Sequence, residues 1–309
     1  MARIPVTPRS LTMTPHPEIE GLGGNGHEVL YSTPGQQPDE AELKRLLPSI
    51  EGWLAGVEPV SEAVIAAADS LKVISRNGIG VDNLPMPALA RRGIAVRTAE
   101  GANAAGVAEL AIALMLSALR HIPSTDRGIK AGQWPRLRGM EIRNRRIGVV
   151  GCGAIGGEVA RLAAALGASV LAYDPARPDL PISPERLRFA EFRELLRESE
   201  VLTLHCPPPT DGRPLIDAPA LASLPRGAIL VNTARAGLVD EEALIAALDE
   251  GQISAYAADV FAEEPPRSLA LAGHPKVIAT SHVGGFTEES VDRATAVAVA
   301  NLLDSLGSR

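Results

Sequence analysis

The stretch that decides the fold is IGVVGCGAIGG, at residues 147–157. An apolar run comes first, a glycine-rich turn follows, and the last residues suit the start of a helix. In such a turn Gly151 makes the sharp bend, Gly153 lets the backbone approach a pyrophosphate, and Gly156 lets the helix lie close to the sheet. Free N–H groups and the positive end of the helix dipole attract the phosphates. The residues expected to bind a dinucleotide here are Gly151, Gly153, Ala154, Ile155 and Gly156.

An acidic residue follows the next apolar run, as such a site requires. Asp174 lies eighteen residues past Gly156 and directly follows ASVLAY, residues 168–173. A carboxylate at this place accepts hydrogen bonds from both ribose hydroxyls and repels an added 2′-phosphate. Arg177, three residues on, weakens this preference a little. The sequence therefore predicts NAD rather than NADP as the cofactor.

Composition narrows the function class. The 309 residues are 46% hydrophobic and 22% charged, which is typical of a globular protein of one or two domains. The net charge of −7 argues against a nucleic-acid partner. The densest basic stretch, residues 136–146, is more simply a solvated connector than a phosphate-binding patch. Two cysteines without paired spacing and six histidines without ligand spacing predict neither a disulfide nor a metal site.

The N-terminus and the apolar segments bear on location. The start, MARIP, lacks the apolar core of a signal peptide. The longest apolar helical stretch, near residues 108–119, is too short to span a bilayer. We therefore expect a cytoplasmic protein with no membrane partner.

Strand-like and helix-like runs alternate in two series, which predicts parallel α/β sheets. The first series has strands expected at 3–6, 52–55, 71–75 and 94–97, and helices at 39–47, 61–68 and 85–91. The second has strands expected at 147–150, 169–173, 201–205, 228–232, 254–257 and 277–280, with helices between them such as 240–248. Six strands of this kind match a doubly wound dinucleotide-binding sheet.

The two series predict two domains. A long helical pattern at 103–121 carries the chain from one to the other, and a final helix is expected at 287–306. The expected fold is a doubly wound, Rossmann-type cofactor domain at 100–285, inserted into a smaller flavodoxin-like α/β substrate domain at 1–99 plus 286–309. The cleft between the domains is the expected site.

Three polar residues follow the late strands, at the edge where α/β sheets place ligands. Arg235 follows LVNTA, Glu264 lies in DVFAEEP, and His282 follows IATS. Each also has a plainer interpretation: a surface cation, a helix-capping acid and a buried core imidazole. Found together beside a cofactor motif, they suit the reduction of a carbonyl group.

At this point the chain resembles the D-isomer-specific 2-hydroxyacid dehydrogenase family. The matching stretches are NGIGVDN at 77–83, VAE at 107–109, the glycine turn at 151–156, NTAR at 232–235, the 259–265 segment and HVGG at 282–285. The similarity is greatest to phosphoglycerate dehydrogenase-like members, mainly through the segment at 75–83. We expect no regulatory domain, because the chain ends at Arg309 directly after the final helix. Serine feedback is accordingly not expected.

The resemblance implies catalytic roles for three residues. His282 is the proton donor and acceptor at the substrate oxygen, and Glu264 binds its far nitrogen, which fixes the tautomer and favours the imidazolium. Arg235 clamps the substrate carboxylate. Further implied contacts are Ile79 and Gly80 for the substrate carboxylate, Asp259 for the nicotinamide carboxamide, and Cys206, Thr233 and Gly285 for the cofactor. One departure is Ala236, where many members carry glycine; its methyl group is tolerable if φ is negative.

The substrate is left open by the fold. The segment SRNGIGVDN at 75–83 favours D-3-phosphoglycerate, because Arg76 matches a position that helps hold a phosphate in some members. A second arginine used by some of them is replaced by the segment at 55–57. Arg9, together with Ser10, is a hypothetical substitute at the end of the first strand, although a solvated loop residue is equally plausible.

Other functions remain as alternatives. One is a hydroxypyruvate, glyoxylate or phosphonate-type 2-keto acid reductase, and another is a non-catalytic NAD(H)-sensing protein. All three residues expected for catalysis are present, which favours an NAD-dependent enzyme. The resemblance also implies a homodimer, formed through the cofactor domain and the helix near 103–121, with Trp134 either in that contact or in the core.

Overall fold

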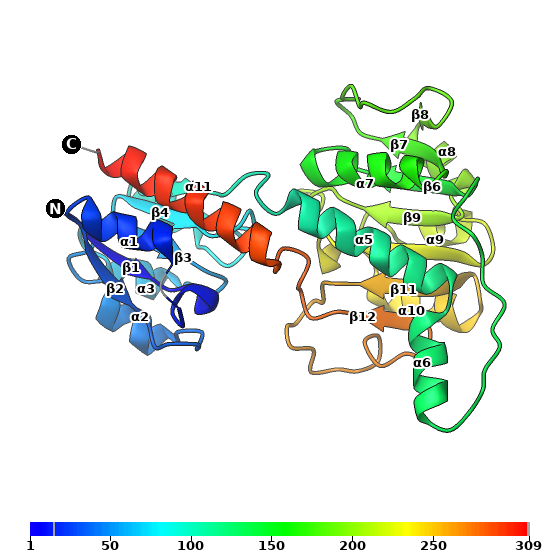
Figure 1. Cartoon of the computed structure of the whole chain (residues 1–309), viewed down its shortest axis with the longest axis horizontal. Coiled ribbons are helices and arrows are strands. Elements are labelled where there is room, and N and C mark those ends of the chain that lie inside the picture. The colour runs from blue at the N-terminus through cyan, green and yellow to red at the C-terminus, as the bar shows by residue number, and fades with distance from the viewer. Residues whose placement is uncertain (15, 308–309) are drawn as a thin grey trace. The chain divides into compact units, whose positions relative to one another are not determined.

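The computed structural model describes residues 1–14 and 16–307. Contacts divide the chain into two compact units (Figure 1). The small unit comprises Met1–Asn103 and Thr287–Arg309, and the large unit comprises Ala104–Phe286. The large unit is thus inserted into the small one. The expected boundaries, after residues 99 and 285, lie within four residues of these.

The small unit contains a five-stranded parallel sheet in the order β2-β1-β3-β4-β5. With strand 1 between strands 2 and 3, this is the flavodoxin-like order. The strands are β1 (Arg3–Val6), β2 (Glu28–Tyr31), β3 (Gly52–Ala55), β4 (Val73–Arg76) and β5 (Ala95–Arg97). The helices are α1 (Pro17–Gly24), α2 (Glu40–Leu46), α3 (Glu62–Ala67), α4 (Met86–Arg91) and α11 (Glu288–Leu306), with a short 3-10 helix at Arg9–Leu11.

The large unit contains a seven-stranded parallel sheet in the order β12-β11-β10-β9-β6-β7-β8. Numbered within the unit, this is 7-6-5-4-1-2-3, the doubly wound order with one added strand. The strands are β6 (Arg146–Val150), β7 (Ser169–Tyr173), β8 (Leu187–Phe189), β9 (Val201–Leu204), β10 (Ala228–Asn232), β11 (Ile253–Ala258) and β12 (Val277–Ala279). The helices are α5 (Ala104–Leu119), α6 (Ile122–Lys130), α7 (Ala154–Ala165), α8 (Phe192–Glu198), α9 (Ala218–Ser223) and α10 (Glu241–Asp249), with a 3-10 helix at Ala236–Leu238.

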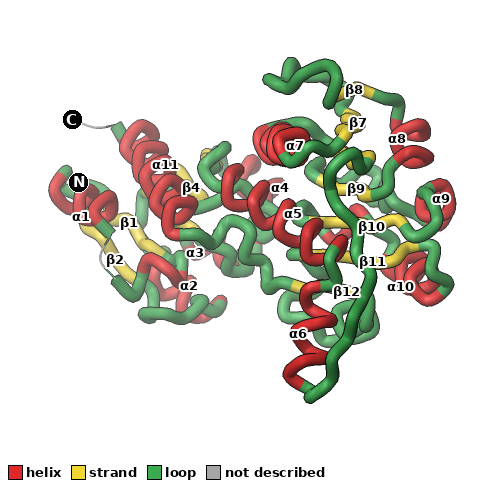
Figure 2. Tube along the Cα trace, turned by 45° about the vertical axis from the view of Figure 1, so that its right-hand side comes forward, coloured by secondary structure: helices red, strands yellow, loops and turns green. Residues whose placement is uncertain are grey.

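Helices cover both faces of the large sheet (Figure 2). Alternate residues of a strand point to opposite faces. In β10, Ile229 and Val231 pack with α5 and α7, whereas Leu230 packs with α8, α9 and α10. Because both faces are buried, the central strands of this sheet, such as β9 and β10, are buried along their whole length and largely apolar. This explains why the sequence shows them as continuous apolar runs.

Helix starts follow their capping residues closely. Side-chain oxygens of Asp39, Ser61, Asp240 and Thr287 accept the N–H three residues on, at the starts of α2, α3, α10 and α11. These bonds satisfy donors that lack a partner within the helix. The expected doubly wound and flavodoxin-like architecture is confirmed, and the elements that were both expected and observed agree within two residues.

Two α-helices and two strands of the described chain were not predicted. Helix α1 contains three glycines, and α6 has only two large apolar residues, Ile122 and Ile129, both exposed, so neither shows the buried apolar face by which a helix is recognised in a sequence. Strands β2 and β8 lie at sheet edges and are short and incompletely buried. The predicted count of six strands in the large sheet is therefore wrong by one: all six predicted strands are present, β12 among them, and β8 is the one that was missed.

In the part of the chain that the structure describes, no single helix is long and apolar enough to cross a membrane. Helices α5 and α6 satisfy that test only as a pair, with a 63° bend between them. Helix α5 lies against α7, β10 and β11 in the core of the large unit.

Candidate active site

The glycine turn between β6 and α7 has the geometry that the sequence predicts. Gly151 has φ +85°, a conformation that favours glycine, and a Cβ there would lie 2.7 Å from the carbonyl oxygen of His205. A Cβ on Gly156 would overlap the carbonyl oxygen of Gly151. These two positions therefore exclude a side chain because of the protein's own backbone.

Gly153 differs from the other two glycines. A Cβ on Gly153 would meet no atom within 4 Å, so the space above it is open. Gly153 is also the N-cap of α7, and no side chain caps this helix. The N–H groups of Ala154 and Ile155 lie in the first turn that follows. An uncapped helix N-terminus beside open space fits a pyrophosphate, so the turn suits the expected dinucleotide.

Asp174 lies at the end of β7, next to this turn. Its Oδ2 accepts the Cys152 N–H at 2.7 Å, and its Oδ1 accepts the Ala176 N–H at 2.8 Å. The two bonds fix the carboxylate against the turn. Each carboxylate oxygen retains a second lone pair, so contacts with ribose hydroxyls stay a prediction. Burial and the Asp174 carboxylate raise the pKa of the Cys152 thiol to about 12, which keeps it protonated.

A hollow of about 350 Å³ follows β7; it is lined by Arg177, Pro178, Asp179, Leu180, Ile182, Pro184, Leu187 and Phe189. Arg177 has φ +44°, and its Nη2 forms a 2.6 Å ion pair with Glu191 Oε1. This ion pair holds the Arg177 guanidinium, the group expected from the sequence to weaken the preference for NAD over NADP. Both side chains are exposed, so the hold is weak.

The end of β9 supplies an imidazole that sequence reasoning missed. His205 Nε2 lies 2.8 Å from Thr203 Oγ1, and its Nδ1 is buried with no hydrogen-bond partner among the described residues. Burial lowers the pKa of His205 to about 3, so the ring is neutral. Cys206 follows it, half-buried, and burial raises its pKa. Thr233 Oγ1 is likewise buried without a partner in the described chain.

His282 and Glu264 meet in the structure. His282 Nδ1 donates to Glu264 Oε2 at 2.7 Å, and Glu264 Oε1 accepts the Phe261 N–H at 3.0 Å. The His282 side chain is 51% exposed, so Nε2 is available to a ligand. His282 also has φ +56°, an unfavourable backbone conformation for a residue with a Cβ. Strained residues of this kind cluster at functional sites.

Asp259 holds the loop that carries His282. Its Oδ1 accepts the Val283 N–H at 2.9 Å and the Thr280 hydroxyl at 2.6 Å, and its Oδ2 accepts the Gly284 N–H at 2.8 Å. Asp259 is 2% exposed. The Asp259 carboxylate thus anchors the loop that contains His282, a role that was not predicted from the sequence. Its predicted contact with the nicotinamide, like that of Gly285 in the same loop, stays a prediction.

Asn232 shapes the turn that presents Arg235. Its Oδ1 accepts the Ala234 N–H at 3.0 Å, and its Nδ2 donates to the Arg235 carbonyl at 2.9 Å and to the Tyr256 hydroxyl at 3.3 Å. Arg235 Nη1 donates to the Ala234 carbonyl at 2.7 Å. Ala236 begins a right-handed 3-10 helix, where a Cβ is tolerated. The departure from glycine at this position is therefore harmless.

Backbone contacts join these loops at one sheet edge. The Asp259 N–H donates to the Asn232 carbonyl at 3.0 Å, between the ends of β10 and β11. Asn232 fixes the Arg235 turn, and Asp259 fixes the His282 loop. An asparagine or aspartate directly after an apolar strand was the available signal for both positioning residues.

The remaining predicted residues lie in the small unit. Arg76 is 4% exposed; its Nε donates to the Gly80 carbonyl at 2.8 Å and its Nη1 to the Ala55 carbonyl at 3.4 Å. Ile79 and Gly80 form the loop that Arg76 holds. Arg9 is exposed at the start of the 3-10 helix after β1. Its role as a substitute phosphate contact stays a prediction.

Comparison with known proteins bears on this arrangement. Residues 112–284 match the model of the D-isomer specific 2-hydroxyacid dehydrogenase NAD-binding domain. The chain is 36% identical over 277 residues to a hydroxypyruvate reductase of Thermotoga maritima, covering 87% of this chain and 89% of that protein. It is 41% identical over 234 residues to a D-3-phosphoglycerate dehydrogenase of Methanocaldococcus jannaschii, covering 75% of this chain and 45% of that protein.

A solved structure agrees over both units. The TT0316 protein from Thermus thermophilus has a TM-score of 0.88 at 32% identity and covers 99% of this chain and 97% of its own. The chain spans about half the length of the curated phosphoglycerate dehydrogenases that it matches. With the glycine turn, Asp174 and the family match in agreement, the chain belongs to the D-isomer specific 2-hydroxyacid dehydrogenases, a family of NAD-dependent oxidoreductases.

Proposed function

We propose that this chain interconverts a small D-2-hydroxy acid and its 2-keto acid, with D-3-phosphoglycerate or a related small acid as substrate. The observation that carries the proposal is the His282–Glu264 pair, 2.7 Å apart beside an NAD-binding sheet. Bound NAD supplies the hydride acceptor, and NADH supplies the hydride. The protein must then move one proton at the substrate oxygen.

His282 is the residue proposed to move that proton. Because Nδ1 is bonded to Glu264 and the side chain is half exposed, Nε2 is the ring nitrogen left for the substrate. In the reducing direction the imidazolium donates its Nε2 proton to the carbonyl oxygen while carbon 2 receives the hydride. In the oxidising direction the neutral Nε2 takes the hydroxyl proton. The Glu264 carboxylate stabilises the charged ring in both directions.

Arg235 is proposed to bind the substrate carboxylate. A planar guanidinium donates two parallel hydrogen bonds to a carboxylate, which fixes the orientation of the adjacent carbonyl group. The Asn232 contacts hold the turn on which Arg235 sits. Orientation of this kind is a large part of catalysis.

The substrate proposal has two versions. Relatives named D-3-phosphoglycerate dehydrogenase favour the phosphorylated acid, and the relative named hydroxypyruvate reductase favours the unphosphorylated one. Steady-state kinetics with glyoxylate, hydroxypyruvate, 3-phosphohydroxypyruvate and a phosphonate-bearing 2-keto acid, each with NADH and NADPH, test both versions. We expect turnover with NADH to exceed turnover with NADPH. Tight NADH binding without turnover of any 2-keto acid would contradict the enzyme proposal and support a sensing role.

We also propose a homodimer, and the apolar surface of α6 and its following loop supports it. Ile122, Ile129, Trp134 and Leu137 are each at least half exposed, and Ile122 and Ile129 lie two turns apart on one helix face. Light scattering tests this. Ile122→Ser with Ile129→Ser should yield monomers, whereas Leu269→Ser, which removes an exposed leucine elsewhere, should leave the mass unchanged.

A further inference from the structure

The small unit contains a buried carboxylate that the proposed mechanism does not use. Glu58 follows β3 and is 1% exposed. Its Oε1 accepts the Gly56 N–H at 2.9 Å and the Thr7 hydroxyl, and Thr7 Oγ1 in turn accepts the Trp53 indole N–H at 2.8 Å. Charged groups are almost never fully buried without partners. This carboxylate is therefore held in place at a cost in desolvation.

A single peptide group separates Glu58 from Arg76. The Ala55 carbonyl accepts from Arg76 Nη1 at 3.4 Å, and the N–H of the same peptide, on Gly56, donates to Glu58 Oε1 at 2.9 Å. The negative charge of Glu58 thus lies close to the positive charge of Arg76. It offsets part of the attraction that Arg76 exerts on an anion at this sheet edge.

The loops at this edge are packed tightly and tied to one another. A Cβ on Gly56 would lie 2.6 Å from Glu58 Oε2 and 2.9 Å from Pro8 Cα. Asn83 Nδ2 donates to the Glu58 carbonyl at 2.6 Å, which ties the Ile79–Gly80 loop to the Glu58 loop. The predicted substrate-binding residues Arg76, Ile79 and Gly80 and the Glu58 carboxylate are therefore joined by hydrogen bonds at one edge of the small sheet.

We propose that Glu58 is a specificity-determining residue that disfavours a phosphoryl group, so that this chain prefers a 2-keto acid whose carboxylate is its only anionic group. The inference rests on the proposed dehydrogenase activity and, of its two proposed substrates, favours the unphosphorylated acid over D-3-phosphoglycerate. A phosphoryl group carries about −1.5 to −2 charge at neutral pH, so it meets more repulsion from a fixed carboxylate than an uncharged hydroxymethyl group does. The predicted carboxylate contacts at Ile79 and Gly80 use backbone N–H groups, which Glu58 leaves in place.

The test compares Glu58→Gln with the wild-type chain on hydroxypyruvate and 3-phosphohydroxypyruvate. Gln keeps an oxygen acceptor for the Gly56 N–H and removes the charge. We expect the ratio of kcat/KM for the phosphorylated over the unphosphorylated substrate to rise about tenfold, since one unit charge is removed at short range. The change should lie in KM for the phosphorylated substrate, because repulsion acts equally on the ground and transition states.

Glu51→Gln is the matched control. Glu51 precedes β3 as Glu58 follows it, and it pairs with Lys72 at the opposite edge of the same sheet. Its removal changes the net charge equally but should leave the ratio unchanged. Equal changes on both substrates in Glu58→Gln would show a merely structural role and overturn the proposal.

A measurement on the wild-type chain tests the role of Glu58 even if the Glu58→Gln variant does not fold. We expect hydroxypyruvate to be the better substrate by kcat/KM. A wild-type preference of tenfold or more for 3-phosphohydroxypyruvate overturns the role of Glu58 while leaving the proposed dehydrogenase activity intact. Absence of turnover with every 2-keto acid overturns both.

Discussion

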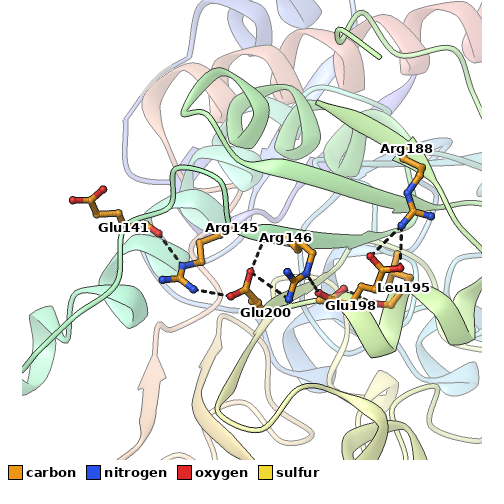
Figure 3. Close-up of polar contacts among 8 residues, drawn as sticks. Glu141, Arg145, Arg146, Arg188, Leu195, Glu198 and Glu200 are labelled. Carbon is orange, nitrogen blue, oxygen red and sulfur yellow. Dashed lines mark hydrogen bonds and ion pairs between the residues drawn. The ribbon is translucent and has the colours of Figure 1, made fainter. Parts of the chain in front are cut away.

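The two edges of the seven-stranded sheet use charge in opposite ways. At the amino edge, Glu200 lies between Arg145 and Arg146, with N–O distances of 2.6 and 3.7 Å, and Arg188 binds Glu198 (Figure 3). Arg188 also binds Glu194, at 2.5 Å. Opposite charges are paired there. At the carboxyl edge, backbone N–H groups bind the carboxylates of Asp174, Asp259 and Glu264, Glu264 also pairs with His282, and part of the bonding capacity of the polar groups is left over.

Unused hydrogen-bonding capacity distinguishes the carboxyl edge, as a ligand-binding site, from the amino edge. The His282 side chain is half exposed at a residue with positive φ, and buried His205 Nδ1 and Thr233 Oγ1 make no hydrogen bond within the described residues. Buried polar atoms without partners are rare and costly in folded proteins. Such cost concentrated at one edge indicates ligand binding, whereas the amino edge contributes mainly to stability.

The largest expected effect is a difference in kcat between variants of two histidine–carboxylate pairs. His282 pairs with Glu264 at the carboxyl edge, and His274 pairs with Asp249 at 3.3 Å before β12 begins. His282→Gln should lower kcat by about 10²–10⁴-fold with NADH affinity retained, because a general acid–base contributes that much. His274→Gln should change kcat little. Steady-state kinetics measures kcat, and NADH fluorescence measures cofactor affinity. A comparable loss of kcat in both variants would contradict a functional difference between the two edges.

A second prediction separates two glycines of the same turn. Gly156→Ala should destabilise the fold by about 1–3 kcal/mol, because its Cβ overlaps the Gly151 carbonyl. Gly153→Ala should leave stability nearly unchanged, because its Cβ meets open space and its φ is −68°. It should still weaken NADH binding if that space admits the pyrophosphate. Thermal unfolding with and without NADH distinguishes the two, and unaltered NADH affinity in Gly153→Ala would place the phosphates elsewhere.

Much of this edge was predictable because each part follows a buried strand. Glu264 and His282 are 18 residues apart, yet both follow strands that pair in the sheet, so the topology predicts that they lie near one another. The hydrogen bonds of Asp259 were not predictable, because two of its partners are the backbone N–H groups of Val283 and Gly284, whose positions depend on the conformation of the loop. Sequence patterns show which side chains are present at an edge and do not show which are already bonded.

The amino edge was harder to predict. The basic stretch at 136–146 was interpreted as a solvated connector, and Arg136 and Arg138 are indeed exposed. Arg145, however, pairs with Glu200 across 55 residues of sequence. Such pairing arises when the parallel strands β6 and β9 come together, with Ile147 opposite Val201. No local sequence pattern indicates this pairing. Strand β8, which contains Arg188, was not predicted, so the ion pairs of Arg188 could not be predicted either.

A third prediction concerns acid stability at the carboxyl edge. Burial lowers the pKa of His205 to about 3 in the folded chain, against an ordinary value near 6.5. Between these values the unfolded chain binds a proton that the folded chain does not, so stability falls as the pH drops from 6.5 toward 3. The slope from this residue is at most about 1.4 kcal/mol per pH unit. His205→Gln should flatten the acid limb in urea unfolding; an unchanged slope would mean that the ring is charged or exposed in the folded state.

The smallest expected effect tests whether the amino edge is only a scaffold. Burial acts to raise the pKa of Glu200, but hydrogen bonds from the Arg146 N–H and the Arg145 side chain outweigh it, so its pKa lies below the ordinary 4.5. Its stabilisation is therefore present above pH 4.5 and is lost as the pH falls through the lowered value. Glu200→Gln should cost about 1 kcal/mol in unfolding free energy at neutral pH, and less in high salt. The cost should vanish in strong acid, where the wild-type carboxyl is protonated as well. Glu198→Gln, at a more exposed side chain, should cost less, and NADH affinity should be unchanged in both variants. A loss of NADH affinity in Glu200→Gln would show that the two edges are coupled through β6 and β9. It would contradict the view that the amino edge contributes to stability alone.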